Sequence, residues 1–367
     1  MAAVRTGAHP MADRRKETRT SSRAIYDILP FERQIADLEA KIDELETLSK
    51  DSSMNLNGQI DSLKDLLQAR VEEVFKGLNP WEKVQVSRAQ GRPLASDYVA
   101  GMCDEFLELH GDRLFRDDQA ILSGIGSIGG QRVLILAHRK GRDTREKIAC
   151  NFGSAHPEGY RKALRKMRMA EKFGLPIVAL INTPGAYPGI GAEERGQAWA
   201  IAENLQAMFD LRVPIVCVVI GEGGSGGALG IGIGDRVLIL EHAYYSVISP
   251  EGCAAILWRD RNRAAEAASA LKLNAQDLLR FGLVDEIITE PVGAAHRDPA
   301  ATVASVKSAI LRHLAELMAM PVPQLLSRRY DKFRAMGSEF QEITDEQVLD
   351  APELSGTDEA PPESAGD

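Results

Sequence analysis

The segment best suited to chemistry is a glycine-rich run at residues 221–234, which reads Gly-Glu-Gly-Gly-Ser-Gly-Gly-Ala-Leu-Gly-Ile-Gly-Ile-Gly. Eight of its fourteen residues are glycine, and it follows directly on an apolar run at 214–220 that is typical of a buried strand. Glycine at this density indicates a backbone that turns sharply or that approaches another group closely. Three kinds of chemistry use such a backbone.

The first is dinucleotide binding. Gly221, Gly223 and Gly226 fit the pattern G-x-G-x-x-G after a strand, and Glu241 stands twenty residues after Gly221, where a ribose acceptor belongs. However, the segment that should form the packed helix contains three further glycines, and each interior glycine costs about 1 kcal/mol of helix stability relative to alanine.

The second is a serine hydrolase. Residues 223–227 fit the G-x-S-x-G elbow, which presents Ser225 as a nucleophile on a tight strand-to-helix turn. The acid and base of a triad in hydrolase order would be Asp285 and His296. His296 lies in a Gly-Ala-Ala-His-Arg-Asp-Pro segment that is more typical of a surface turn.

The third is an oxyanion hole made of backbone alone. Consecutive glycines that lead into a short helix present N–H groups to a developing negative charge, and the helix dipole adds to them. The missing side chains then leave room for a ligand. This interpretation explains the density of glycines best, and it requires neither a nucleophile nor a side-chain base.

The elements around this run alternate. Apolar runs predict strands at 120–127, 132–137, 176–182, 214–220, 236–241 and 284–288, and periodic segments predict helices at 95–109, 159–173, 192–209 and 300–318. Apolar strands that alternate with helices indicate an α/β fold with a parallel sheet buried on both faces.

The flanking segments differ from this body. Apolar residues spaced three and four apart predict a helical hairpin within 25–80, with its turn near 51–57. We expect a disordered basic extension at 1–24, a body at 81–320, a C-terminal helical segment at 321–337 and a disordered acidic tail at 338–367.

Composition excludes several classes of protein. The chain has 367 residues and a net charge of −9, but the tail alone holds ten acidic residues and no Lys or Arg, which leaves 43 acidic against 44 basic residues elsewhere. We therefore expect no nucleic-acid partner. No apolar run approaches the roughly 20 residues of a membrane span, and we expect a cytoplasmic protein without a membrane partner. The four cysteines, at 103, 150, 217 and 253, contain no Cys-x-x-Cys pair, so no metal site is predicted.

Three blocks together resemble the α subunit of bacterial acetyl-CoA carboxylase carboxyltransferase. Residues 183–197 read Thr-Pro-Gly-Ala-Tyr-Pro-Gly-Ile-Gly-Ala-Glu-Glu-Arg-Gly-Gln, residues 221–227 open the glycine run, and residues 245–254 read Tyr-Ser-Val-Ile-Ser-Pro-Glu-Gly-Cys-Ala. Supporting blocks lie at 138–147, 151–153 and 157–163, and the resemblance extends over about 28–335. The family commonly carries Asp where this chain has Asn182.

The resemblance implies a crotonase-like (ClpP/crotonase) fold of repeated ββα units and an α2β2 assembly with a zinc-ribbon β subunit. It implies transfer of a carboxyl group from carboxybiotin, held on a separate biotin carboxyl carrier protein, to acetyl-CoA, which gives malonyl-CoA for fatty-acid synthesis. ATP is then used by a partner biotin carboxylase. Propionyl-CoA is the alternative acyl acceptor, and a non-catalytic scaffold that docks the carrier is a rival of another class.

By the same resemblance, the N–H groups of Gly226 and Gly227 serve the biotin side as the catalytic donors. We expect Gly223, Gly224 and Tyr187 to shape the substrate pocket, and Arg259 and Arg261 are candidates for contact with acyl-CoA phosphates. A basic loop is a second phosphate candidate, although a solvated loop is also consistent with its composition; it contains Arg139, Lys140, Arg142, Arg145 and Lys147.

Overall fold

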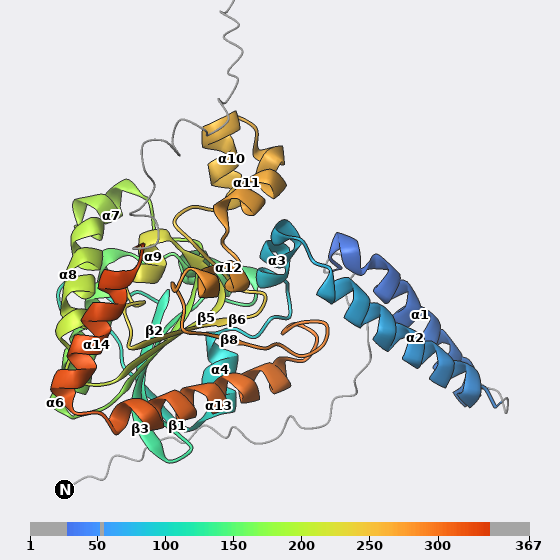
Figure 1. Cartoon of the computed structure of the whole chain (residues 1–367), viewed down its shortest axis with the longest axis horizontal. Coiled ribbons are helices and arrows are strands. Elements are labelled where there is room, and N and C mark those ends of the chain that lie inside the picture. The colour runs from blue at the N-terminus through green and yellow to red at the C-terminus, as the bar shows by residue number, and fades with distance from the viewer. Residues whose placement is uncertain (1–27, 52–54, 338–367) are drawn as a thin grey trace, which may run out of the picture. The chain divides into compact units, whose positions relative to one another are not determined.

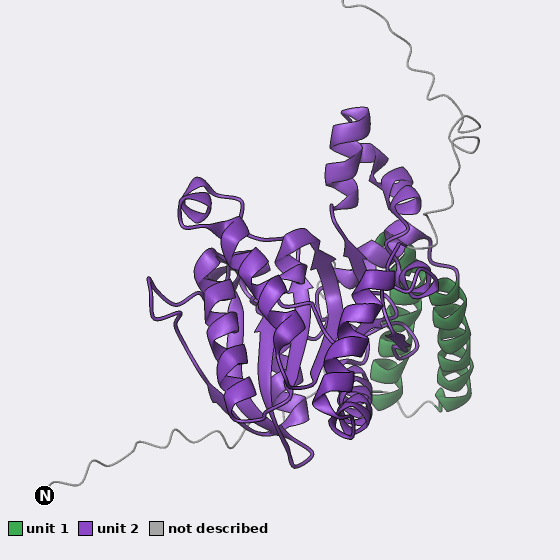
Figure 2. Ribbon diagram, turned by 60° about the vertical axis from the view of Figure 1, so that its left-hand side comes forward, with its two compact units in different colours: residues 1–76 green, residues 77–367 purple. Residues whose placement is uncertain are grey.

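The computed structural model describes residues 28–51 and 55–337. The basic extension at 1–24 and the acidic tail at 338–367 lie outside the described residues. The chain divides into two compact units, residues 1–76 and residues 77–367 (Figure 2). The boundary therefore falls after residue 76, whereas the sequence pattern placed it at residue 80.

The first unit contains two long helices that run side by side (Figure 1), preceded by a short 3-10 helix, η2 (Pro30–Glu32). The long helices are α1 (Arg33–Asp51) and α2 (Asn57–Lys76). Their buried positions are Ile35, Ile42, Ile60, Val71 and Phe75. These residues follow the helical spacing of the sequence, so each helix buries its apolar stripe within the pair.

The second unit is built around an eight-stranded sheet with the order β1-β2-β3-β4-β5-β6-β8, and β7 pairs with β5. The strands are β1 (Cys103–Glu108), β2 (Ile121–Ile128), β3 (Gln131–His138), β4 (Ile177–Thr183), β5 (Ile215–Gly224), β6 (Arg236–Leu240), β7 (Tyr244–Ser246) and β8 (Glu286–Ile288). Every residue of β4 and β5 is buried, as their continuous apolar runs predict.

The sheet is mixed rather than wholly parallel. Strands β1, β2 and β3 pair antiparallel, and the pairs from β3 through β4, β5 and β6 to β8 are parallel. The predicted helix at 95–109 is therefore wrong in its second half, because α4 (Ala95–Met102) ends where β1 begins. Pairing with β2 outweighs the weak local helix preference of Cys103–Glu108.

Helices cover both faces of the sheet (Figure 2). Helix α6 packs against α8 and strand β2, and α13 packs against α4. The predicted helix at 192–209 is two helices, because Gly196 adopts a φ of +79° between them. The remaining helical elements are α3 (Pro80–Ser87), α5 (Thr144–Ala149), η3 (Asn151–Gly153), α6 (Pro157–Lys172), α7 (Ile190–Glu194), α8 (Gln197–Asp210), α9 (Ser225–Leu229), α10 (Pro250–Trp258), η4 (Arg261–Arg263), α11 (Ala264–Leu271), α12 (Ala275–Arg280), α13 (Pro299–Met318) and α14 (Val322–Ala335).

Helices α10 and α11 stand out from the sheet as a projection (Figures 1 and 2). Cys253 and Ala254 of α10 and Ala267 of α11 form a small core of their own. Across the described ranges, no helix is both long and apolar enough to cross a membrane.

Candidate active site

The glycine-rich run begins as a strand and ends as a helix. Strand β5 continues through Gly224, with β6 beside its first half and β7 beside Glu222–Gly224. Helix α9 starts at Ser225 and has only five residues. The dinucleotide interpretation is therefore wrong, because it requires a phosphate loop followed by a packed helix. The Glu241 carboxylate instead accepts a hydrogen bond from the Glu290 N–H.

Most of these glycines pack so closely against neighbouring protein atoms that a side chain would not fit, and they do not border a space left open for a ligand. A Cβ on Gly227 would lie 2.5 Å from the backbone nitrogen of Ala186, and one on Gly224 would collide with the Pro184 carbonyl oxygen. A Cβ on Gly223 would lie 2.9 Å from the Tyr245 ring. The expectation that the missing side chains leave room for a ligand thus holds for Gly226 alone, where the nearest atom, on Ile201, would be 3.6 Å away.

Gly226 and Gly227 lie in the first turn of α9, after Gly224 as the N-cap. The first N–H groups of a helix have no intrahelical acceptor and lie at the positive end of the helix dipole. Gly226 also lines a largely apolar cavity of about 310 Å³. Its wall includes Ile233, Tyr245, Leu278, Phe333 and Met336. The turn therefore combines backbone donors with an apolar cavity.

Glu222 is the one charged residue of the glycine run, and it is the centre of a buried ion-pair network. Its carboxylate accepts hydrogen bonds from Arg88 Nε at 2.6 Å, from the Tyr244 hydroxyl at 2.8 Å and from Lys140 Nζ. Arg88 also pairs with Glu251 of α10. Burial opposes ionisation of Glu222, but Lys140 and Arg88 more than offset it and lower its pKa to about 2.

The neighbouring titratable groups are buried as well. Burial lowers the pKa of Lys140, while Glu222 opposes that change. Burial lowers the pKa of His138, at the end of β3, to about 3, so its imidazole is neutral at pH 7. Sequence reasoning missed Glu222, Arg88 and His138 as members of this site. The available signal was a carboxylate inside a buried, glycine-rich strand.

Part of the basic loop lines a second cavity, of about 340 Å³, beside Glu222 and Pro184. Lys140, Arg142 and Lys147 contribute to its wall. Arg139 instead pairs with Glu108 at 2.9 Å, and Arg145 is exposed outside the cavity lining. The loop therefore divides between a cavity and the surface.

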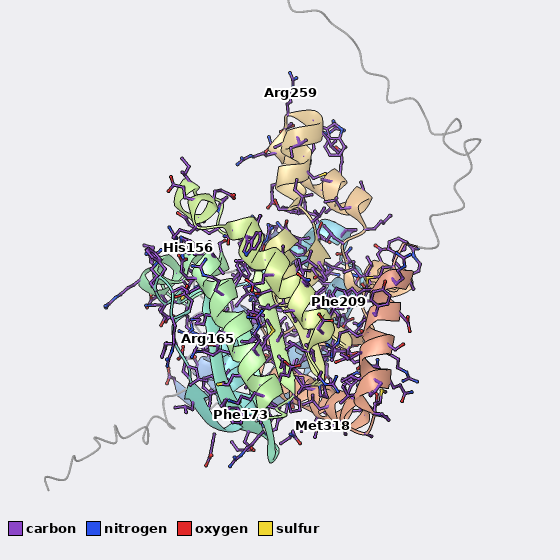
Figure 3. All side chains as sticks on the ribbon, turned by 90° about the vertical axis from the view of Figure 1, so that its left-hand side faces the viewer. His156, Arg165, Phe173, Phe209, Arg259 and Met318 are labelled. Atoms are coloured by element: carbon purple, nitrogen blue, oxygen red, sulfur yellow. The ribbon has the colours of Figure 1, made fainter. Side chains whose placement is uncertain are left out.

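Tyr187 follows the loop that packs on Gly227. Its ring stacks on His156, with the ring centroids 4.1 Å apart, and its backbone N–H donates to the Ala155 carbonyl at 3.0 Å. Arg259 and Arg261 are exposed, and Figure 3 places Arg259 at the outer end of the α10–α11 projection. In Figure 1, α9 lies below that projection, nearer the sheet. The structure thus brings Tyr187, but not these two arginines, near the glycine turn.

The hydrolase interpretation fails on geometry. Ser225 does adopt a φ of +51°, as a nucleophile elbow would. However, the Asp285 carboxylate accepts the Val237 N–H at 2.6 Å, and Val237 pairs with Cys217 near the start of β5. Ser225 follows Cys217 by eight residues, so about 26 Å of nearly continuous strand separates it from the strand position beside the proposed acid.

Comparison with known proteins decides the family. A family model described as acetyl co-enzyme A carboxylase carboxyltransferase-like matches residues 28–337. The chain belongs to this family. Proteins named acetyl-coenzyme A carboxylase carboxyl transferase subunit alpha are 53% identical in Rhodopirellula baltica and 51% identical in Synechococcus elongatus. Both matches cover 84% of this chain, and they cover 97% and 95% of those proteins.

The fold of this carboxyltransferase chain is also found in the β subunit of P. aeruginosa geranyl-CoA carboxylase. That structure is 18% identical with a TM-score of 0.50, and the match covers 67% of this chain and 46% of the other. The predicted crotonase-like α/β fold is confirmed. Within residues 28–51 and 55–337, no three His, Cys, Asp or Glu side chains are grouped as a metal site requires, and the four cysteines are free thiols.

Asn182 is buried beside the backbone of the glycine run. Its Oδ1 accepts the Glu222 N–H at 3.1 Å, and a Cβ on Gly221 would lie 2.8 Å from that oxygen. The amide oxygen can therefore perform the acceptor role of a carboxylate here without adding a second negative charge beside Glu222.

Proposed function

We propose that this chain is the α half of a biotin-dependent acetyl-CoA carboxylase carboxyltransferase. It moves a carboxyl group from carboxybiotin, carried on a biotin carboxyl carrier protein, to acetyl-CoA and so forms malonyl-CoA. The observation that carries the proposal is the turn at Gly226, where backbone donors meet an apolar cavity in a chain of this family.

The residues at this turn fit the biotin ring. Carboxybiotin supplies the carboxyl group, and its ureido ring supplies the nitrogen that takes the acetyl proton. The apolar wall formed by Ile233, Tyr245 and Phe333 suits the hydrocarbon part of such a group. The N–H groups of Gly226 and Gly227 then donate to the ureido oxygen as it becomes negative, which is where fixed donors lower a barrier most.

The role of the protein is therefore electrostatic rather than acid–base. Neutral His138 and the ion-paired Glu222 are held in fixed protonation states at pH 7, so neither is poised to exchange a proton. Glu222, Arg88 and Lys140 instead hold the end of β5 in place. Gly223, Gly224 and Tyr187 shape the backbone around the turn.

The second half of the reaction belongs to a partner. The enolate of acetyl-CoA needs its own donors, and we assign these to a zinc-ribbon β subunit in an α2β2 assembly. Large apolar side chains near the turn and on the α10–α11 projection support a protein partner, because Leu229 is 37% exposed, Val247 76% and Ile256 71%. A biotin carboxylase that uses ATP would recharge the carrier.

The test is malonyl-CoA decarboxylation in the presence of free biotin. The full chain is assayed alone and after mixing with a zinc-ribbon β subunit, and complex formation is followed by size-exclusion chromatography. We expect activity only in the mixture. Activity of the chain alone would contradict a shared site. A stable complex without activity on malonyl-CoA, but with activity on methylmalonyl-CoA, would replace acetyl-CoA by propionyl-CoA as the acceptor.

A further inference from the structure

Helix α9 has few side chains by which the rest of the fold could hold it. It has five residues, of which two are glycine. Of the other three, only Ala228 is buried, and Leu229 is 37% exposed. The N-cap is Gly224, which has no side chain to cap the first turn. The side chains of α9 itself can therefore do little to fix the direction of this helix.

The carbonyl groups near the C-terminal end of α9 are instead held by side chains from two other helices. The Gly227 carbonyl accepts the Tyr160 hydroxyl of α6 at 3.3 Å, while Ile231, whose N–H would bond to it in a longer helix, donates elsewhere. The side-chain amide of Asn204 on α8 donates to the carbonyl of Gly230, the C-cap, at 2.8 Å. The last carbonyls of a helix have no intrahelical donor, so buried ones need a partner of this kind.

Tyr160 and Asn204 are also joined to each other. The Asn204 amide nitrogen donates to the Tyr160 backbone carbonyl at 3.1 Å. The Tyr160 ring packs so closely on Gly230 that a Cβ there would lie 2.5 Å from two of its ring carbons. Both side chains are fully buried, and burial raises the pKa of the Tyr160 hydroxyl, so this group stays protonated and able to donate. The two residues thus act on α9 as one unit.

The amide of Asn204 carries a cost that an apolar side chain would avoid. Its Oδ1 is buried and has no hydrogen-bond partner among the described residues. A buried oxygen without a donor destabilises a fold. A leucine of similar size would have no such oxygen, but it could not donate to the carbonyls of Tyr160 and Gly230. The amide therefore indicates that the position of these two carbonyls matters.

We propose that Tyr160 and Asn204 are positioning residues for carboxyl transfer, which fix the direction of α9 and so aim the N–H groups of its first turn at the ureido oxygen. At about 1.5 Å per residue, the two ends of this helix lie only about 6 Å apart, so a shift of its last carbonyls also moves the N–H groups of Gly226 and Gly227. A misplacement of about 1 Å can cost about 100-fold in rate. This inference rests on the proposed function, because the ureido oxygen is the acceptor that the N–H groups serve.

The test removes the donors one at a time. Tyr160→Phe removes the hydroxyl and keeps the ring, and Asn204→Leu removes the amide at similar volume. The control for the first variant is Tyr98→Phe, because Tyr98 is also fully buried and its hydroxyl has no partner within the described part of the chain. The control for the second is Thr302→Val, which removes a buried hydroxyl that donates to the Asp298 carbonyl at the start of α13, at 2.9 Å.

Each full-length variant is assembled with the β partner. We measure kcat and KM for malonyl-CoA decarboxylation with free biotin, and urea unfolding in parallel. We expect kcat to fall about tenfold in Tyr160→Phe and about 100-fold in Asn204→Leu. The KM for malonyl-CoA should stay unchanged, because the N–H groups act on charge that develops only in the transition state. Both controls should keep the parental kcat, although Thr302→Val loses stability.

An active parent complex whose kcat is unchanged in Tyr160→Phe would overturn this inference and leave the proposed function intact, even where Asn204→Leu fails to fold. An equal fall of kcat in Tyr98→Phe would also overturn it, because the loss of any buried hydroxyl would then have the same effect. A parent complex without activity would overturn the proposed function and this inference together, so the two failures are distinguishable.

Discussion

Replacing Gly226 and Gly227 by alanine, one at a time, separates the catalytic role of the turn from its packing role. At Gly227 the new methyl group would lie 2.5 Å from both Ala186 N and Gly185 C and 2.9 Å from Gly185 Cα, all of which are backbone atoms. Backbone cannot rotate away, so we expect Gly227→Ala to destabilise the fold by about 1–3 kcal/mol or more.

At Gly226 the same methyl group meets only Ile201, at an ordinary contact distance of 3.6 Å. Because α9 gains a better helix former, Gly226→Ala should leave stability unchanged or raise it by about 0.5–1 kcal/mol. Gly226 lines the apolar cavity, so we expect the added methyl group to keep the ureido oxygen away from the backbone N–H groups, although alanine retains its own N–H. Losing one such hydrogen bond costs about 2.7–4 kcal/mol in the transition state, so kcat should fall about 100- to 1000-fold.

The assay pairs urea unfolding with malonyl-CoA decarboxylation in the presence of the β partner. The expected pattern is a stable but inactive Gly226→Ala and a destabilised Gly227→Ala. Parental turnover in Gly226→Ala would refute the assignment of this turn as the oxyanion hole. Parental stability of Gly227→Ala would refute the packing argument.

Three further outcomes can be checked. Arg329→Leu should lower the free energy of unfolding by about 3–5 kcal/mol in urea titrations. Two guanidinium nitrogens of Arg329 contact the Asp235 carboxylate at 2.8 Å, so the substitution would leave Asp235 with a buried and unpaired charge. A loss of stability under about 1 kcal/mol would contradict this prediction. The pKa of Glu222 is about 2, below its ordinary value of 4.5, so its contribution to stability is complete above pH 4.5 and is lost as the pH falls towards 2. Glu222→Gln should remove that part of the acid dependence, and identical pH profiles of parent and variant would count against it. Ser225→Gly should retain carboxyl transfer, because glycine accepts the φ of +51° and the proposed Asp285 lies far from the Ser225 hydroxyl. A tenfold drop in turnover would instead support Ser225 as a catalytic nucleophile.

The central strands were predictable because their signal is local. The apolar runs at 176–182 and 214–220 correspond to β4 and β5, whose residues are all buried. β1 was missed because Cys103–Glu108 continues a helical segment with alternating polar residues, and only its pairing with β2 makes it a strand. The three residues of β7 form a strand only because β5 extends beyond β6.

The position of the glycine turn was predictable from the sequence, whereas the residues that contact it were not. Glycine density marked the turn, but the sequence could not show that Gly227 packs on the backbone at Ala186. Nor could it show that Glu222 meets Lys140 and Arg88, since those residues come from distant parts of the chain. Contacts of this kind depend on sheet order, which no local pattern encodes.

Arg88 gives the molecule a mechanical link between its sheet and the α10–α11 projection. One guanidinium contacts Glu222 on β5 and Glu251 on α10 at once. Any swing of α10 away from the sheet must therefore separate a pair of opposite charges, whereas sliding one apolar surface over another would meet no such resistance. A protein that docks on the projection and tilts it would weaken the contacts of Arg88 with Glu251 and Glu222. Lys140 would then be the main partner of Glu222. A displacement of α10 and α11 would in this way be transmitted to β5, the strand that leads into the glycine turn.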